Sequence, residues 1–558
     1  MPAIKTEKQL AKFLAVGSFL VTILVVTGMG TDPVNLPKLS LLGLISFACV
    51  GLLGKDLFSI KSYLASFIPV AAILFMVGLT ASYLMGSGPG IQNFYGSYGR
   101  NTGSLTYFLF LVLLIAAAKL VELSSYIVII RYFLYAGIIN VIYCYWVILT
   151  KKDPIPWTNP YGTILGTLGN PDFVSAFLGM VFSAIFCLIF NKKLNYKIRS
   201  GLFVLLPLIL YLIVRSKAIQ GLLVLSIGML ITFYFLIREK FNSRMQLYYL
   251  SLVTLLSIFA VAGIFQKGIF SSILYKPSVS IRGAYWRAAF EMFKDSPLWG
   301  LGLGSFGDSY KKYRDFKSTI VPGLEVSTDA AHNTLLDFLS GGGLLLTIPY
   351  LLILGYCLVV SIRFIKSHKE IDFIFSTIFI VWICYLTQSI VSINQIGLAI
   401  WGWVFSGLLL SYSLNYTKTE KSGFANKVSK PSVYELEPAK YLVVIANIVL
   451  GGLIACLPQY AEFKWSQAAH AGSAGDLIAA MNQFPQSNMR YLQTSKALAG
   501  SGMQPEALEA LKRSSKFNPD NLDTWILLSG TSYGVQNQQY IMGQIQRLDP
   551  LNKSYLIK

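Results

Sequence analysis

Three side chains in the middle of the sequence are of the types that bind phosphate and transfer protons. His332 stands near the end of a long polar and aromatic segment, Arg282 stands near its start, and Arg215 lies further upstream. A neutral imidazole can accept a proton from a hydroxyl group near neutral pH. A guanidinium group presents a planar fork that matches phosphate oxygens. The three residues could hold a diphosphate leaving group beside a base, if the fold brings them to one face.

Neighbouring residues have competing interpretations. Lys217 can replace Arg215 as a phosphate ligand, and Arg215 can instead be a residue that snorkels from the end of a span. His368 and His470 lie in a basic loop and a polar tail, and we interpret both as surface residues. The loop acids show no DxD spacing, and the six cysteines show no CxxC or Cys/His spacing. We therefore expect neither a metal site nor another cofactor.

The composition is typical of a chain that crosses a membrane many times. Of the 558 residues, 54% are hydrophobic and only 13% are charged, which is about half the charged share of a soluble protein. The first apolar stretch, residues 13–29, has no cleavage site after it, so we expect a retained helix. The net charge of +20 could indicate a nucleic-acid partner, but the basic residues gather in loops between apolar stretches. We therefore expect membrane lipid rather than nucleic acid around this chain.

Apolar windows long enough to cross the ~30 Å hydrocarbon core as helices recur along the chain. There are about thirteen, and the second and seventh are short or weakly bounded. We therefore predict an all-α fold with a polytopic membrane domain over residues 1–460. The windows cover residues 11–29, 40–54, 62–85, 103–118, 125–150, 172–190, 200–214, 220–237, 246–265, 333–362, 371–391, 395–414 and 441–458.

The distribution of lysine and arginine predicts which side each loop faces. With a cytoplasmic N-terminus, the loops on that side carry about 21 basic residues, whereas the short loops opposite carry about six. Cytoplasmic loops of membrane proteins are enriched in these residues. The long loop 266–332 and the C-terminal tail would then face outward. Loops 86–102 and 151–171 would do so too, and their glycine, proline and aromatic residues are typical of loops that line a site, with ordinary ordered turns as the alternative.

The tail, residues 461–558, shows a weak internal repeat. Three segments begin about 34 and 31 residues apart, and each has proline in second place and an aromatic residue five or six positions later. The spacing resembles that of tetratricopeptide repeats, in which helix pairs stack and bury shared apolar faces. We predict a small extracytoplasmic helical domain that binds a protein partner or docks on its own membrane domain. The segments are FPQSNMRYLQ, NPDNLDTWIL and DPLNKSYLIK, which start at residues 484, 518 and 549.

The order of residues in segment 280–343 resembles the signature of the O-antigen ligase and O-antigen polymerase superfamily, which includes bacterial O-linked protein oligosaccharyltransferases. The resemblance covers roughly residues 10–415. A preceding segment, GTLGNPDFVSAFLG at 166–179, is similar to an outer loop of many members. The signature consists of Arg282, the PLWGLG run at 297–302, His332-Asn333 and Gly342-Gly343.

This resemblance implies a metal-independent, inverting glycosyltransferase with a GT-C-like membrane domain. Such an enzyme takes a glycan from an undecaprenyl diphosphate donor at the outer face of the bacterial cytoplasmic membrane. His332 would activate the acceptor hydroxyl, and Arg282, with Arg215 or Lys217, would hold the diphosphate. The supporting residues would be Asn333, Arg314 and Asn170.

Two departures from the family pattern leave alternatives open. Leu346 stands where the ligase pattern has a further glycine, and the usual Ser-Arg-Gly-like turn reads RSKAIQG at 215–221. The second phosphate ligand is therefore Arg215 or Lys217. The acceptor can be a glycan, a lipid or a protein, because ligases, polymerases and protein-glycosylating enzymes share the donor and differ in the hydroxyl.

Two other classes of function fit a polytopic chain. A flippase or other transporter of lipid-linked glycans would show repeated spans and polar residues near the membrane midplane. Here the polar residues gather instead at the outer ends of the spans and in the longest loop. A membrane scaffold that uses its repeat tail would leave the arginine and histidine set unexplained. The sequence therefore favours an enzyme.

Overall fold

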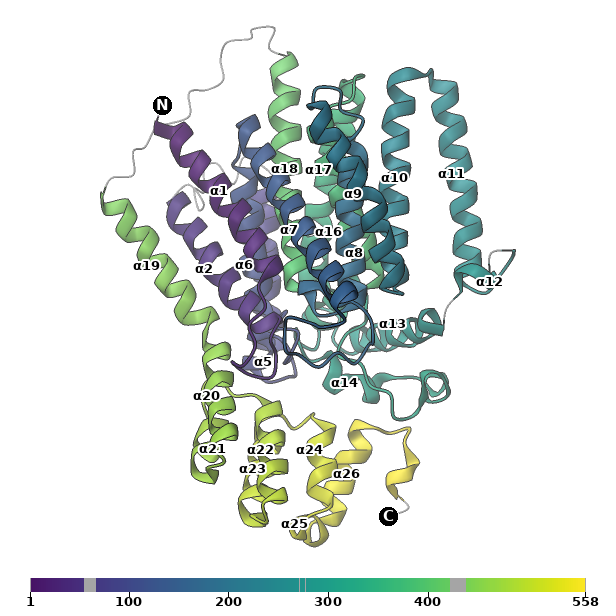
Figure 1. Ribbon diagram of the computed structural model, residues 1–558. Helices are drawn as coiled ribbons and strands as arrows, with labels where there is room; N and C mark the ends of the chain where they lie inside the picture. Colours follow the sequence, from purple (N-terminus) through teal and green to yellow (C-terminus); the bar gives the residue numbers. More distant parts are fainter. Residues whose placement is uncertain (1, 55–66, 270, 276, 422–437, 557–558) are drawn as a thin grey trace.

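The structure, a computed structural model, describes residues 2–54, 67–269, 271–275, 277–421 and 438–556. Every regular element in these ranges is a helix (Figure 1), which confirms the all-α prediction. Some of the basic loop residues that predict the orientation lie outside the described residues, namely Lys55, Lys61, Lys427 and Lys430.

Long apolar helices make up most of the chain, and each of the predicted windows coincides with one of them. In order they are α1 (Pro2–Ile23), α2 (Asn35–Leu53), α4 (Phe67–Met85), α6 (Ser104–Ala118), α7 (Leu123–Thr150), α8 (Pro171–Leu188), α9 (Tyr196–Arg215), α10 (Ile219–Lys240), α11 (Ser243–Ile264), α16 (Thr334–Ser367), α17 (Phe373–Val391), α18 (Ile396–Lys421) and α19 (Pro438–Ala455).

Not all of these helices are long and apolar enough to cross a membrane. Among the described residues, 10 meet that condition by length and composition, or 11 if α19 and α20 (Leu457–Ala471), which meet at a bend of 49°, form one span. The count is below the predicted thirteen because α1 is charged in its first half and α6 has only 15 residues. About 20 apolar residues are needed to span the hydrocarbon. The chain is a multi-pass membrane protein.

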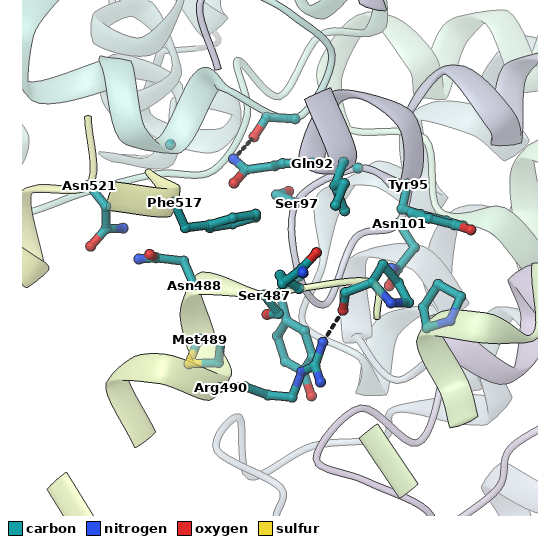
Figure 2. A pocket seen from close by; sticks show the side chains of 18 of the residues that line it. Gln92, Tyr95, Ser97, Asn101, Ser487, Asn488, Met489, Arg490, Phe517 and Asn521 are labelled. Carbon is teal, nitrogen blue, oxygen red and sulfur yellow. Dashed lines mark hydrogen bonds between the residues drawn. The ribbon is translucent and has the colours of Figure 1, made fainter. Parts of the chain in front are cut away.

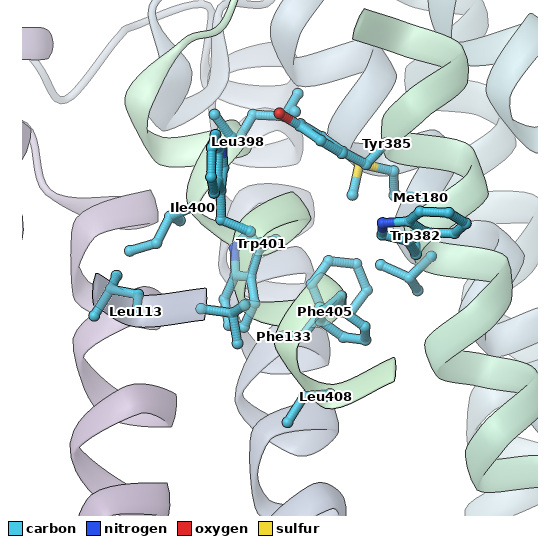
Figure 3. Packing of buried hydrophobic residues seen from close by; sticks show 14 of the residues in the cluster. Leu113, Phe133, Met180, Trp382, Tyr385, Leu398, Ile400, Trp401, Phe405 and Leu408 are labelled. Carbon is cyan, nitrogen blue, oxygen red and sulfur yellow. The ribbon is translucent and has the colours of Figure 1, made fainter. Parts of the chain in front are cut away.

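Helix α18 lies at the centre of the bundle and is the most completely buried of the candidate spans. Its Trp401 packs edge-on against Phe133 of α7, with ring centroids 5.1 Å apart, and its Phe405 packs against the same ring (Figure 3). The Trp401 Nε1 donates to Thr22 Oγ1 at 2.7 Å, so the polar edge of this buried ring is paired. This well-packed centre holds the helix ends that carry the site.

Short helices cover one end of the bundle, opposite the N-terminus (Figure 1). Among them α13 lies across the bundle end. Its apolar positions recur at helical spacing, and Ala284, Ala288 and Met292 are buried against α14 and the start of α16. This small core fixes loop 266–332 as an ordered layer. The short helices are α5 (Gly90–Tyr95), η2 (Gly166–Leu168), α12 (Ser271–Leu274), α13 (Pro277–Asp295), α14 (Phe306–Tyr313), α15 (Phe316–Ser318) and η3 (Thr319–Gly323).

The PLWGLG run packs its backbone against a break in α16. Four backbone hydrogen bonds of 2.8 to 3.0 Å join residues 297–302 to residues 340–345. Helix α16 is interrupted at Gly343, whose φ of 60° is left-handed. Gly300 has a φ of 69°, and a Cβ there would lie 2.3 Å from the carbonyl carbon of Gly341. Only glycine permits this backbone at so close an approach. The glycines of the signature therefore allow residues 297–302 to pack directly against α16.

Substitution of Gly300 by alanine is expected to destabilise the protein by at least about 2 kcal/mol. A left-handed alanine costs roughly 1–2 kcal/mol, and steric overlap with α16 adds about 1–3 kcal/mol. The measurement is the thermal unfolding midpoint of the full chain in detergent. Gly268→Ala is the control, because Gly268 also has a positive φ but no described atom lies within 4 Å of its Cβ position. Equal effects of the two substitutions would contradict the close packing against α16.

The C-terminal tail consists of packed helices. Helix α22 lies along α23, and α24 lies along α26. The first two proline-containing segments run into α22 and α24, and their aromatic residues, Tyr491 and Trp525, are buried in these helices. The Tyr555 side chain of the third segment lies outside the described residues, and the predicted boundary at 460 falls within α20. The tail helices are α20 to α26 at Leu457–Ala471, Ala474–Met481, Asn488–Gly500, Gln504–Phe517, Leu522–Ser529, Ser532–Gln536 and Gln538–Leu548, followed by η4 (Lys553–Leu556).

The tail is docked on the same end of the bundle as α13 and α14 (Figure 1). Arg314 Nη2 lies 2.7 Å from Asp549 Oδ1, and neither side chain is exposed to solvent. Asp308 of α14 accepts hydrogen bonds from the amides of Asn518 and Asn521 at 2.9 and 3.1 Å. Removal of one partner from a buried ion pair leaves an uncompensated charge. These contacts therefore hold the tail in a fixed position on loop 266–332.

Candidate functional site

His332 lies in the turn that leads into α16, beneath α13. Its backbone is left-handed, with a φ of 55°. The N–H of the preceding Ala331 donates to Asp337 Oδ1 at 2.7 Å, which fixes the turn. The half-buried imidazole stacks on the ring of Tyr285 from α13, with ring centroids 5.7 Å apart. The turn and α13 together hold the imidazole in one place.

Two arginine–carboxylate pairs flank this histidine. Arg282 Nη2 of α13 lies 3.6 Å from Asp172 Oδ2 of α8. Arg100 makes two contacts with Asp329, from Nε to Oδ2 at 2.6 Å and from Nη2 to Oδ1 at 3.2 Å. Among the described residues, no group of three or more His, Cys, Asp or Glu side chains could hold a metal ion. The cluster is thus a histidine between paired charges, contributed by α8, α13 and two loops.

Burial and the neighbouring cations keep His332 unprotonated. Burial is the largest cause that lowers the pKa of the imidazole from 6.5 to about 4. The positive charges of Arg282 and Arg100 lower the pKa further, while the negative charge of Asp329 opposes them. A histidine with such a pKa is neutral near pH 7, so one ring nitrogen has a lone pair that can accept a proton.

The two predicted asparagines cap helices around the cluster. Asn333 caps α16 by accepting hydrogen bonds from two backbone N–H groups of its first turn. Asn170 caps α8 by accepting from the N–H of Asp172 at 2.8 Å, and its Nδ2 donates to the Tyr161 hydroxyl at 3.0 Å. Side-chain caps of this kind satisfy the free N–H groups of a helix start. Both asparagines therefore position neighbours of His332 and Arg282.

Arg215 and Lys217 lie in a separate place, at the end of α9 and in the turn that follows it. Both side chains are exposed. The Arg215 carbonyl accepts from Thr163 Oγ1 at 2.8 Å, which joins this turn to the loop that carries Asn170. Neither residue is among the charges that act on His332. The structure thus places them near the loop of the site but outside the central cluster.

Arg314 is not part of the cluster around His332. Its guanidinium pairs with Asp549 of the tail, and its Nη1 donates to the Leu324 carbonyl at 2.6 Å. The contact with Asp549 joins the loop to the tail, and the contact with Leu324 lies within the loop. The position of Arg314 therefore indicates a role in docking the tail rather than in direct contact with the central group.

Three members of the cluster were missed by reasoning from the sequence. Arg100 and Asp329 pair across 229 residues, and no local pattern relates them. Asp172 stands two residues after Asn170, inside the GTLGNPDFVSAFLG segment, so the resemblance there was a signal that could have identified it. Charged residues in loops that are rich in glycine and aromatic residues are therefore candidates for functional sites.

A cavity opens beside the cluster, between the start of α2, loop 151–171 and the start of α8. Its volume is about 530 Å³. Binding sites for small molecules commonly occupy about 300–1,000 Å³ and combine apolar walls with a few placed polar groups. Its lining includes Asn170, Trp157, Tyr161 and Arg100, so it offers amide, hydroxyl and aromatic groups to a ligand beside an arginine that is paired with Asp329.

Residues 208–351 match the family model described as O-antigen ligase. The chain carries an O-antigen ligase family domain. No curated protein and no solved structure matches the chain. The match does not extend to the tail, whose tetratricopeptide-like character stays a prediction. The matched segment contains most of the predicted site residues, namely Arg215, Lys217, Arg282, Arg314, His332 and Asn333.

The O-antigen ligase family domain does not contain the whole cluster. Arg100, Asn170 and Asp172 precede the matched residues. They reach His332 and Arg282 because α8 and loop 86–102 lie at the same end of the bundle as α13. The site is therefore assembled from the matched domain and from the earlier spans.

Proposed function

We propose that this protein is a membrane glycosyltransferase that transfers or polymerises a glycan from an undecaprenyl-diphosphate-linked donor onto an acceptor hydroxyl. The observation that carries the proposal is His332, neutral and flanked by Arg282 and Arg100, within a multi-pass bundle and a segment that matches O-antigen ligases. A base beside two cations suits the transfer of a group away from an anionic leaving group. The product would be a surface polysaccharide or a glycoprotein.

The proposed reaction is a single inverting displacement. A ring nitrogen of His332 takes the proton of the acceptor hydroxyl as the hydroxyl oxygen bonds to the anomeric carbon of the donor. The bond between that carbon and the diphosphate oxygen breaks, and its electron pair leaves with the diphosphate. Arg282 stabilises the charge that develops there, and Arg215 or Lys217 provides a second positive charge. The arginines supply the charge neutralisation, and no metal or cofactor takes part in this scheme.

The pH dependence of turnover follows from the charges around His332. In the free enzyme, the pKa that limits kcat/KM on the acid side is expected to be about 4 rather than about 6.5. Activity is retained while the imidazole is neutral and falls as the pH drops through that pKa. A bound diphosphate raises the pKa of His332 because its negative charge opposes that of Arg282, so kcat should show a higher acid-side pKa.

Initial rates across the acid range, at low and at saturating donor, measure both pKa values. An acid limb of kcat/KM near pH 6.5 would contradict the arrangement of cations around the imidazole. Identical limbs for kcat/KM and kcat would contradict diphosphate binding beside it.

We place this site, loop 266–332 and the tetratricopeptide-like tail on the outer face of the bacterial cytoplasmic membrane, with the N-terminus inside. The loop charges and the position of the N-terminus at the opposite end of the bundle support this orientation (Figure 1). Lys317 is exposed in the loop, and five of the six native cysteines are buried. A cysteine introduced by Lys317→Cys should react with an impermeant maleimide on intact cells or protoplasts. Labelling only after permeabilisation would refute the orientation.

Deletion of the gene tests the function and separates a transferase from a flippase. Without a transferase, lipid-linked glycan accumulates on the outer leaflet, where a glycosidase added to protoplasts can remove it, and long chains disappear from one acceptor class. Without a flippase, the lipid-linked glycan accumulates where the added glycosidase cannot reach it. Wild-type protein should restore the chains. Normal chain lengths in the deletion strain would overturn the proposal.

A further inference from the structure

A second cavity lies between the docked tail and the outer end of the bundle (Figure 2). One wall comes from α5 and the loop that follows it, and the other comes from α22 and the end of α23. Its volume is about 240 Å³, a little below the roughly 300–1,000 Å³ of sites for drug-sized ligands, so it suits a small ligand. Its α5 wall belongs to loop 86–102, which the sequence predicts to line a site, whereas none of the individual site residues proposed from the sequence lines it.

Four of the five charged residues that line this cavity are already paired, and the fifth, Asp523, is exposed. Arg490 Nε lies 3.3 Å from Glu462 Oε1, and Asp329 is held by Arg100. Asp308 accepts hydrogen bonds from the amides of Gln92, Asn518 and Asn521. The buried lining therefore offers amide groups and aromatic faces rather than an uncompensated charge. Such a surface suits a neutral ligand rich in hydroxyl groups, and it does not suit an ion.

The Asn101 amide brings a buried polar atom to the wall of this cavity. Asn101 is 3% exposed, and its Oδ1 accepts no hydrogen bond from any residue that the structure describes. A buried polar atom without a partner costs about 1–3 kcal/mol. Figure 2 shows Asn101 on the wall opposite Phe517, which comes from the last turn of α23. An amide that accepts from a hydroxyl, facing a ring that a pyranose can cover, is the chemistry of a sugar site.

The cavity and the proposed base share one neighbour, Asp329. Asp329 lines the cavity, and the charge of Asp329 acts on His332. Arg282, the proposed diphosphate ligand, is not in its lining and pairs with Asp172 of α8. An inverting displacement requires the attacking hydroxyl and the leaving diphosphate on opposite faces of the anomeric carbon. Because Arg282 is outside this cavity, we take the cavity as the side from which the hydroxyl attacks.

We propose that this interdomain cavity is the acceptor subsite and that the acceptor is a saccharide, held between Asn101 of the bundle and Phe517 of the tail. The inference rests on the proposed glycosyl transfer and specifies its acceptor. The saccharide hydroxyl gives its proton to His332 and its oxygen to the anomeric carbon of the donor, while the diphosphate leaves. The tail then serves to close the acceptor site, and the protein lengthens or joins glycan chains rather than modifying a protein.

The test uses the full chain in nanodiscs with saturating lipid-linked donor. The acceptor probe is the oligosaccharide that mild acid releases from the undecaprenyl-diphosphate-linked glycans of the producing cells. Asn101→Gly removes the amide and suits the positive φ of 56°, and Phe517→Ala removes the ring. Each should raise the KM for the acceptor about tenfold and leave kcat and the donor KM within about twofold. Val535→Ala, on an exposed side chain of α25, is the matched control in the tail.

The other possible outcomes would contradict the subsite, the saccharide acceptor or the proposed reaction separately. A raised donor KM with an unchanged acceptor KM would assign the cavity to the donor glycan. Transfer to a protein and not to the oligosaccharide would refute the saccharide acceptor. Equilibrium binding of the same oligosaccharide to the His332→Asn protein is measured in parallel by calorimetry. If no turnover is found but binding is seen and is weakened by Asn101→Gly, the subsite stands and the proposed reaction fails. If the wild type turns over but no variant changes acceptor binding, the subsite is wrong and the proposed function stands.

Discussion

The variant His332→Asn is expected to lower kcat for glycan transfer by about 10² to 10⁴, which is the usual contribution of general-base catalysis. Asparagine tolerates the left-handed backbone that His332 adopts, so this substitution removes the base with little strain. Its thermal unfolding midpoint should stay close to that of the wild type. Transfer is measured with purified protein, lipid-linked donor and labelled acceptor. A decrease in kcat of less than about tenfold would exclude His332 as the base.

A second substitution separates a catalytic role of His332 from a purely structural one. Glycine also accepts the φ of 55°, and His332→Gly leaves a space beside Tyr285 where the imidazole lay. Added imidazole should restore part of the activity of His332→Gly and none of that of His332→Asn, whose side chain occupies the space. Failure of imidazole to rescue, together with a lowered unfolding midpoint for both variants, would indicate that the histidine only supports the turn.

The variant Arg282→Ala is expected to lower kcat by about 10² to 10³, since that is the cost of losing one donor to a developing anion. Arg282→Lys should recover only part of this loss, because lysine keeps the charge but lacks the planar fork. The control is Arg287→Ala. Arg287 lies on the same helix, is half exposed and pairs with Asp315, away from the histidine. Equal losses for the two alanine variants would show that α13 merely needs its arginines to fold.

The ion pair between Arg282 and Asp172 allows a further distinction. If Arg282 serves only to join α13 to α8, then Asp172→Asn, which breaks the pair from the other side, should reproduce the loss seen with Arg282→Ala. If Arg282 binds diphosphate, Asp172→Asn should leave kcat within about tenfold of the wild type, because the guanidinium keeps its charge and its ligand. Measurement of kcat for both variants decides between the two roles.

The proposed site combines residues inside and outside the segment that matches the O-antigen ligase family. The matched segment supplies the proposed base and the proposed diphosphate ligands, whereas Arg100 and Asp172 come from residues before it. Arg100 contributes to the low pKa of His332, so the state of the base depends on a loop outside the matched domain. Residues 208–351 by themselves are therefore expected to lack a complete site.

Much of the fold could be predicted from the sequence because its signals are local. Each apolar window became a helix, since a run of apolar residues in lipid must satisfy its own backbone hydrogen bonds. The structure has fewer candidate spans than predicted because α1 is charged in its first half and α6 is short. Gly300 and Gly343 stood out as a motif, although their steric reason, the contact of residues 297–302 with α16, appears only when the two segments are packed together.

The site was predictable only in part. His332 and Arg282 were visible in the sequence because an imidazole and a guanidinium each have a recognisable chemistry, and the segment that carries them also matches a family. The pairing of Arg100 with Asp329 and the cavity under the tail were not predictable. They join residues hundreds of positions apart, and such contacts depend on how the helix ends and the tail pack, not on any local pattern. The sequence by itself determined the helices and indicated the proposed base and one cation. The tertiary structure decided which charges surround that histidine and formed the cavity under the tail.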